Sequence, residues 1–158
     1  RSGPITTWEY SHRLHEWTYA PVQYPHLVQD YYQANRDILA GSFLNGGKIG
    51  EWSTGAPSDY VWMKVLWNPE LDVDAILDKL CKRMFGKAAD TCREMLRIKV
   101  ERWENAPWRE ELGDAGRVSH AVVADTWPPD VVAQLSKLRD RARREMKGNP
   151  VLPGCAQP

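Results

Sequence analysis

Two glutamates next to aromatic residues are the side chains of this sequence best suited to chemistry. Glu9 lies in the run Trp8-Glu9-Tyr10, and Glu51 lies in the run Gly50-Glu51-Trp52. Glycosidases place two carboxylic acids around the bond they cleave, because an oxocarbenium-like transition state needs both a proton donor and a negative charge. Glu9 and Glu51 are therefore candidate catalytic residues. The alternative is that each has a structural role, because such acids often cap helices or pair with arginine.

Aromatic side chains near these acids are the candidates for binding a substrate. Trp8, Tyr10, Trp52 and Tyr60 carry flat rings that can stack on the apolar faces of sugars, and His12 lies just beyond the first acid. Packing in a core or an interface explains each ring equally well. We keep all five as candidate substrate-binding residues for a carbohydrate ligand. No ligand set for a metal and no motif for a cofactor is recognisable.

A strand–helix–strand unit is expected to bring the two acids together. Ile5–Tyr10 is rich in β-branched and aromatic residues and predicts a strand, and Pro25–Gly41 has the spacing of a helix. Lys48–Trp52 predicts a second short strand. Such a unit leaves its strands parallel, with their carboxyl ends at one edge. Glu9 and Glu51 are thus predicted to lie side by side.

The rest of the chain is predicted to be helical. The expected features, in order, are a helix opened by Ser58 and ended by Asn68-Pro69, a helix with Asp72 and Asp74 in its first turn and Gly86 after its end, a helix over Ala88–Asn105, an irregular connection over 107–127 that contains His120, and a last helix opened by Pro128-Pro129-Asp130. Trp62 and Trp67 are assigned to the core. The chain is predicted to divide into a βαβα part of a barrel-like domain over residues 1–69, a helical region over 70–148 and an extended tail over 149–158.

Composition excludes several classes of protein. The 158 residues carry 21 Lys plus Arg and 21 Asp plus Glu, so the formal net charge is zero and nothing indicates nucleic-acid binding. No apolar run has the length of a membrane span, and no signal peptide is recognisable. The three cysteines show no metal-binding spacing and are expected to be buried thiols.

Two short strands do not make a stable parallel sheet by themselves. Parallel sheets are covered on both faces and need neighbouring strands for their hydrogen bonds. A βαβ unit followed by helices therefore looks like the last strand–helix units of a (β/α)-barrel-like domain, which typically needs about 250 residues. Three interpretations are open: the chain is a fragment of such a domain, it pairs with another chain, or the strands are loops on a helical domain.

One stretch of the sequence resembles a known family. Tyr60–Leu96, preceded by Gly46–Ser53, is similar to the carboxyl-terminal part of a bacterial glycoside-hydrolase-like family, domain of unknown function 4838. The matching pieces are the Leu-Trp-Asn-Pro helix end at 66–69, the Asp-Val-Asp-Ala helix start at 72–75 and the Phe-Gly-Lys-Ala-Ala run at 85–89. The resemblance implies a (β/α) barrel related to α-glucuronidases, whose upstream strands are absent here.

The expected function follows from these pieces. The first hypothesis is the carboxyl-terminal portion of a carbohydrate-active enzyme that supplies Glu51 and aromatic groups to a sugar-binding cleft. Such a chain is not expected to be active alone, and its partners are a carbohydrate and the missing part of the domain or another chain. The family resemblance implies a secreted or periplasmic location. The alternative is a non-catalytic helical binding or assembly module with a Trp-rich surface for a glycan or a protein.

Overall fold

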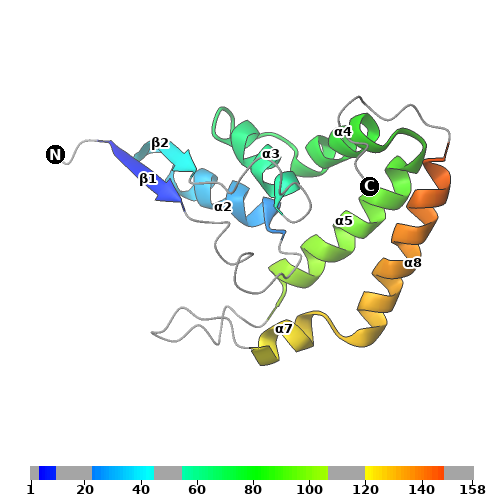
Figure 1. Cartoon of the computed structure of the whole chain (residues 1–158). Helices are drawn as coiled ribbons and strands as arrows, with labels where there is room; N and C mark the ends of the chain where they lie inside the picture. The colour runs from blue at the N-terminus through cyan, green and yellow to red at the C-terminus, as the bar shows by residue number, and fades with distance from the viewer. Residues whose placement is uncertain (1–3, 10–22, 45–54, 107–119, 148–158) are drawn as a thin grey trace.

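The computed structural model describes residues 4–9, 23–44, 55–106 and 120–147, which form a small parallel sheet attached to a larger group of helices (Figure 1). The described part of the chain is thus mostly helical, with α/β character confined to its amino-terminal region. The elements in chain order are β1 (Ile5–Glu9), α2 (Pro25–Asn35), β2 (Leu39–Leu44), α3 (Ala56–Val65), α4 (Val73–Phe85), a 3-10 turn (Gly86–Ala88), α5 (Ala89–Glu104), α7 (His120–Thr126) and α8 (Pro129–Glu145).

The strand–helix–strand unit is present, but its second strand differs from the predicted one. Strand β1 pairs in parallel with β2, and helix α2 connects them, beginning at Pro25 as expected. The helix ends at Asn35 instead of continuing to Gly41, because Ile5 N–H donates to Ile38 O at 2.9 Å and draws the chain into the sheet. The predicted strand Lys48–Trp52 lies outside the described residues.

The main core lies where α2, α3, α4 and α5 meet. Trp62 of α3 is only 4% exposed, as predicted, and its indole N–H donates to the hydroxyl of Tyr32 on α2 at 2.8 Å. The other buried members of this core are Val28, Val61, Val65, Val73, Leu77, Cys81, Leu96 and Val100. The prediction that Trp67 belongs to the core is wrong. Helix α3 ends at Val65, and Trp67 on the following turn is 90% exposed.

Ser58 ties the segment before α2 to α3 and does not open a helix. Its hydroxyl donates to Gln23 Oε1 at 2.9 Å and accepts from Tyr24 N–H at 3.0 Å. Helix α3 starts two residues earlier, at Ala56, with Gly55 as its cap residue. The predicted start was wrong because the Ser58 side chain is fully buried and is used in a contact distant in sequence.

Helix α4 carries the end signals that the sequence predicts. Asp72 Oδ1 accepts from Ala75 N–H at 2.9 Å, which satisfies a backbone donor that the first turn leaves unpaired. Gly86 follows the helix with φ of 51°, a conformation that residues with a side chain rarely adopt. The chain then enters α5 through the 3-10 turn, so that α4 and α5 pack against each other.

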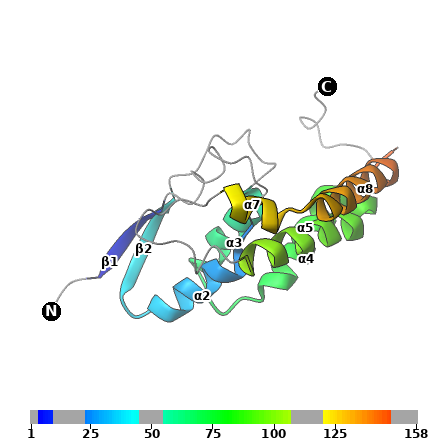
Figure 2. The same ribbon diagram turned by 90° about the horizontal axis from the view of Figure 1, so that it is seen from below.

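Helix α8 packs against α5 and extends the helical layer, whereas the preceding connection is partly helical. Figures 1 and 2 both show α4, α5 and α8 lying side by side. Ile98 of α5 forms a second small core with Val131 and Leu138 of α8.

The connection predicted to be irregular contains α7, because its Ala-Val-Val-Ala run forms a short helix beside Trp103 and Trp127.

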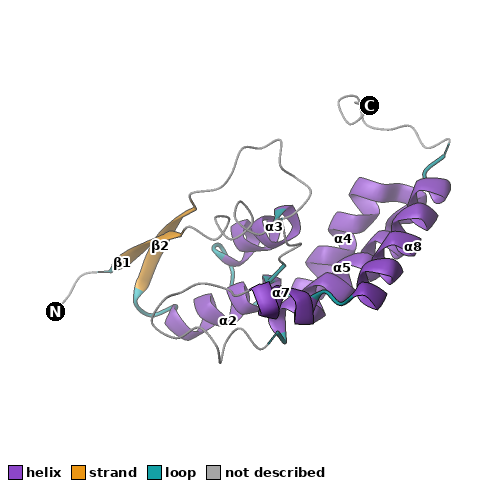
Figure 3. Ribbon diagram, turned by 60° about the horizontal axis from the view of Figure 1, so that its bottom comes forward, coloured by secondary structure: helices purple, strands orange, loops and turns teal. Residues whose placement is uncertain are grey.

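The sheet stands at one end of the molecule, away from α4 and α8 (Figure 3). Ile5 and Trp8 of β1, and Ile38 and Phe43 in or next to β2, are all exposed large hydrophobic residues. Apolar side chains on a parallel sheet are normally covered by helices or further strands.

None of the described helices combines the length and the apolar character that a membrane crossing requires.

Candidate functional site

An exposed aromatic pair marks the carboxyl ends of the two parallel strands. Trp8 of β1 lies in register with Phe43 of β2, and their ring centroids are 5.0 Å apart at an interplanar angle of 63°. Trp8 is 63% exposed and Phe43 57% exposed, so the pair forms a surface rather than a core. This pair, here called the aromatic platform, offers exposed apolar ring surface to a ligand, but its two rings meet edge to face and do not lie in one plane. Phe43 was missed in the sequence because its segment was assigned to the end of a helix and the turn after it.

The polar side of the same sheet is held by a side-chain hydrogen bond. Thr7 Oγ1 donates to Ser42 Oγ at 3.0 Å across the strands. Because side chains alternate along a strand, Thr7 and Ser42 lie on the face opposite Trp8 and Phe43. The aromatic platform and the hydroxyl pair therefore belong to different faces of the sheet.

Glu9 is the candidate catalytic residue that falls on a described strand. It is the last residue of β1, opposite Leu44 of β2, so the neighbouring strand end carries no acid. The other candidates Tyr10, His12, Glu51 and Trp52 lie outside the described residues. The pairing of Glu9 with Glu51 stays a prediction.

Tyr60, the remaining candidate, lies on α3 and not on the sheet. It is half-buried, and the ammonium of Lys64, one helical turn further on, lies 5.5 Å from the centroid of its ring. This cation–π contact covers part of one ring face. A sugar that stacked on Tyr60 would have to use the other face or displace Lys64.

A network around His26 joins three helices and was not predicted. Glu104 of α5 accepts from the backbone N–H of His26 at 2.8 Å and from its ring Nδ1 at 2.9 Å. Ring Nε2 of His26 lies 3.6 Å from Asp74 of α4, and Arg93 donates to Asp74 and Asp78 at 2.6 Å each. Glu104 thus holds the first turn of α2, whose free N–H groups favour an anion.

The electrostatics of this network predict a pH-dependent contribution to stability. The hydrogen bond to Glu104 raises the pKa of His26 above its ordinary value of 6.5, against the opposing effect of burial, and the charges of Glu104 and Asp74 add to the rise. Because the pKa is higher in the folded state, protonated His26 contributes stability below about pH 6.5. That contribution is lost as the pH rises through the folded-state pKa.

We expect His26→Gln to destabilise the protein more at pH 5.5 than at pH 8.5, by less than about 1 kcal/mol because His26 is 37% exposed and solvent screens its charge. Urea unfolding at the two pH values measures this difference. Glu104→Gln serves as the control, since it removes the main cause of the raised pKa and should make the effect of His26→Gln nearly independent of pH. If His26→Gln destabilised the otherwise wild-type protein equally at pH 5.5 and pH 8.5, the assignment would be contradicted.

Metal binding finds no support among the side chains that the structure places. Within 4–9, 23–44, 55–106 and 120–147, no three His, Cys, Asp or Glu residues are arranged to hold an ion. The carboxylates nearest to His26 are already engaged by Arg93 or by backbone N–H groups. This network is therefore best described as a structural connection among α2, α4 and α5.

Comparison with known proteins identifies the family of the chain. The family model described as Domain of unknown function (DUF4838) matches residues 2–97. No curated protein and no solved structure gives a significant match. The matched residues run from before β1 into α5, so they include the sheet and most of the main core but leave out α7 and α8. Because the match covers more than half of the 158 residues, the chain belongs to the domain of unknown function 4838 family.

Proposed function

We propose that the chain is the carboxyl-terminal portion of a glycoside-hydrolase-like, carbohydrate-active protein. In this proposal the carboxyl end of the parallel sheet supplies a glutamate and aromatic rings to a sugar-binding cleft. The observation that carries the proposal is the exposed Trp8–Phe43 pair at the strand ends, directly before Glu9 in β1. The exposed rings are suited to the apolar face of a sugar, and Glu9, the next residue of β1, supplies a carboxyl group at the same strand end.

The state of the sheet supports an origin in a larger α/β domain. β1 and β2 form a two-stranded sheet whose large apolar side chains at Ile5, Trp8 and Phe43 are exposed. A two-stranded parallel sheet is marginal without further strands and covering helices. We propose that the further strands and covering helices are the other strand–helix units of a (β/α)-barrel-like domain. β1, α2 and β2 would then be among the last units of that domain.

The roles of the acids follow from the chemistry of glycoside cleavage. One carboxyl group would protonate the leaving oxygen while the other acts as base or nucleophile. We assign these roles to Glu9 and Glu51 as a pair, without dividing them, and assign ring stacking to Trp8. Tyr10, His12, Trp52 and Tyr60 are further candidate contacts to the sugar. The chain is proposed to bind glycan at this edge and to need the complete domain for turnover.

Calorimetric titration of the chain with neutral and acidic oligosaccharides tests the proposal. We expect binding, and we expect Trp8→Ala to weaken it about tenfold, since an aromatic contact contributes about 0.5–1.5 kcal/mol beyond its buried area. Trp67→Ala is the matched control, because Trp67 is also exposed but lies on the turn after α3. Absence of binding by the wild-type chain would contradict the proposal.

A second candidate function rests on a different surface. Met63, Leu66 and Trp67 are exposed together over the last turn of α3 and the residues after it. Exposed apolar groups that gather in this way are typical of contacts with a partner. A helical binding or assembly module would use this patch, and loss of binding in Trp67→Ala but not in Trp8→Ala would favour it over the sugar-cleft proposal.

A further inference from the structure

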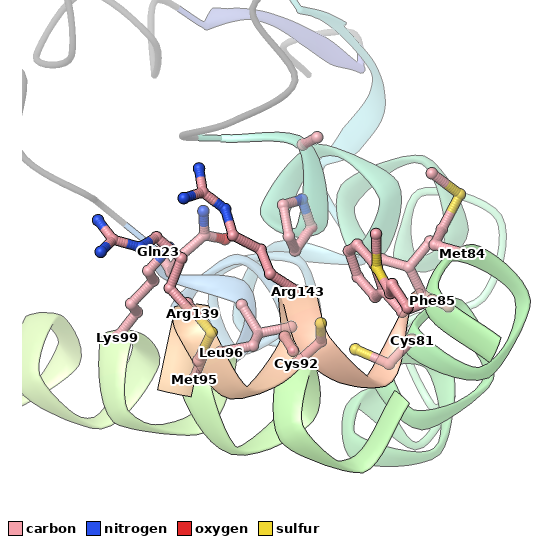
Figure 4. A pocket seen from close by; sticks show the side chains of 15 residues that line it. Gln23, Cys81, Met84, Phe85, Cys92, Met95, Leu96, Lys99, Arg139 and Arg143 are labelled. Carbon is pink, nitrogen blue, oxygen red and sulfur yellow. The ribbon is translucent and has the colours of Figure 1, made fainter. Parts of the chain in front are cut away.

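A cavity of about 550 Å³ lies on the helical side of the molecule, apart from the sheet. Its walls come from the second half of α4, residues 92–99 of α5, the second half of α8, the start of α3 and Gln23 before α2 (Figure 4). The volume is in the range of sites for small organic ligands. The apolar part of the lining is rich in sulfur and includes Cys81, Met84, Phe85, Cys92, Met95 and Met146.

Three cationic side chains line the same cavity. Figure 4 shows Lys99, Arg139 and Arg143 toward one side of it, while Met84, Phe85 and Cys81 lie toward the other. Arg139 pairs with Asp140 at 2.9 Å. Lys99 and Arg143 have no carboxylate partner among the residues that the structure describes, and no acidic residue lines the cavity. The site therefore combines an apolar body with an unbalanced positive end.

The environment of Lys99 makes an anion at this end favourable. Burial lowers the pKa of Lys99 below its ordinary value of 10.5, because its charge has lost part of its hydration. Among the described residues, the acidic group that acts on Lys99 is the thiol of Cys92. Burial raises the pKa of this thiol to about 11, so it is neutral at pH 7. An anionic ligand group would restore a partner to Lys99.

We propose that this cavity binds a small amphipathic anion, a carboxylate with an unbranched alkyl body. The carboxylate would lie between Lys99 and Arg143, whose guanidinium can hold it through two hydrogen bonds. The alkyl body would lie against the Met and Phe side chains, since methionine adapts its shape to flexible apolar ligands. Gln23 is the one uncharged amide in the lining, and its Oε1 already accepts from Ser58, so the lining offers few acceptors for the hydroxyl groups of a sugar.

This binding site is independent of the sugar cleft proposed at the sheet. No residue of β1 or β2 lines the cavity, and the sheet that carries Trp8, Glu9 and Phe43 stands at the other end of the molecule. The two proposals can therefore fail separately. A Trp8→Ala variant should bind the amphipathic anion as well as the wild type does.

Isothermal titration of the full chain with decanoate tests the proposal, and 1-decanol is the neutral comparison ligand. We expect decanoate to bind at least about tenfold more tightly than decanol, because a charge-assisted hydrogen bond contributes roughly 1.5–3 kcal/mol. Lys99→Met and Arg143→Met should each weaken decanoate binding by about tenfold or more on the same grounds. Arg144→Met is the matched control, since Arg144 is exposed on α8 and does not line the cavity.

A second measurement separates lost binding from lost folding. Decanoate should slow the alkylation of Cys92 by iodoacetamide at pH 9 in the wild type, followed by peptide mass mapping, because Cys92 lines the cavity. Circular dichroism of each variant checks that the helices are intact. Equal affinity for decanoate and decanol, unchanged affinity in both folded cation variants, or no protection of Cys92 would overturn the proposal.

Discussion

Replacement of Trp62 by alanine is expected to lower the free energy of unfolding by about 3–5 kcal/mol, the usual loss for removing a buried Trp. The indole is 4% exposed and packs in the core where α2, α3, α4 and α5 meet. Its N–H also donates to the hydroxyl of Tyr32 at 2.8 Å, so the substitution leaves both a cavity and a polar group without its partner. Urea unfolding followed by circular dichroism measures the loss.

Trp67 supplies the matched control for this prediction. It lies five residues further on, but it is 90% exposed on the turn after α3. We expect Trp67→Ala to change the free energy of unfolding by no more than about 0.5 kcal/mol. If the two substitutions cost the same amount, the placement of α3 against the core is wrong.

Leu77→Ala is expected to destabilise the protein by about 2–5 kcal/mol. Leu77 is 0% exposed in the middle of α4 and belongs to the same core as Trp62. Alanine is a good helix former, so the loss reports the cavity and the buried apolar surface rather than the helix itself. The midpoint and slope of urea unfolding measure it.

Lys79→Ala on the same helix is the control for Leu77→Ala. Lys79 is exposed, and its replacement should change stability by no more than about 0.5 kcal/mol. A loss at Leu77 below about 1 kcal/mol would contradict the placement of this side chain in a close-packed core. Both variants keep the caps of α4 at Asp72 and Gly86 intact.

Helices whose signals are local could be predicted from the sequence. α4 has an acidic cap, an apolar stripe and a glycine after its end, and it begins and ends at the expected residues. α5 and α8 were predicted within a residue or two, since proline and regular apolar spacing mark them. In these segments the residues that decide the structure are neighbours in the sequence.

Elements that depend on distant contacts could not be predicted in the same way. The apolar spacing of α2 continues to Ile38, but hydrogen bonding with β1 ends the helix early and makes Leu39–Leu44 a strand. Trp67 fits the apolar pattern of α3, yet the helix stops at Val65 and leaves it exposed. The spacing of apolar residues predicts which face of a helix is apolar. It does not show where hydrogen bonds from a distant segment will end the helix.

The candidate site shows the same division. Trp8 and Glu9 lie on a strand, as predicted, because the β-branched and aromatic residues that indicate it are neighbours in the sequence. The strand ends at Glu9, one residue before its predicted end. Phe43 was missed because its position beside Trp8 depends on the register of two strands 35 residues apart. The contact between His26 and Glu104 spans 78 positions and leaves no spacing in the sequence that could reveal it.

Calorimetric titration of the Trp8→Ala and Trp67→Ala variants with an oligosaccharide that the wild-type chain binds is the most direct test of the proposed function. We expect Trp8→Ala to weaken binding about tenfold and Trp67→Ala to retain the wild-type affinity. Both side chains are exposed tryptophans, so the comparison isolates the strand end as the site of contact. Unchanged affinity in Trp8→Ala, or no binding of neutral or acidic oligosaccharides by the wild type, would contradict a sugar-binding role for the sheet edge.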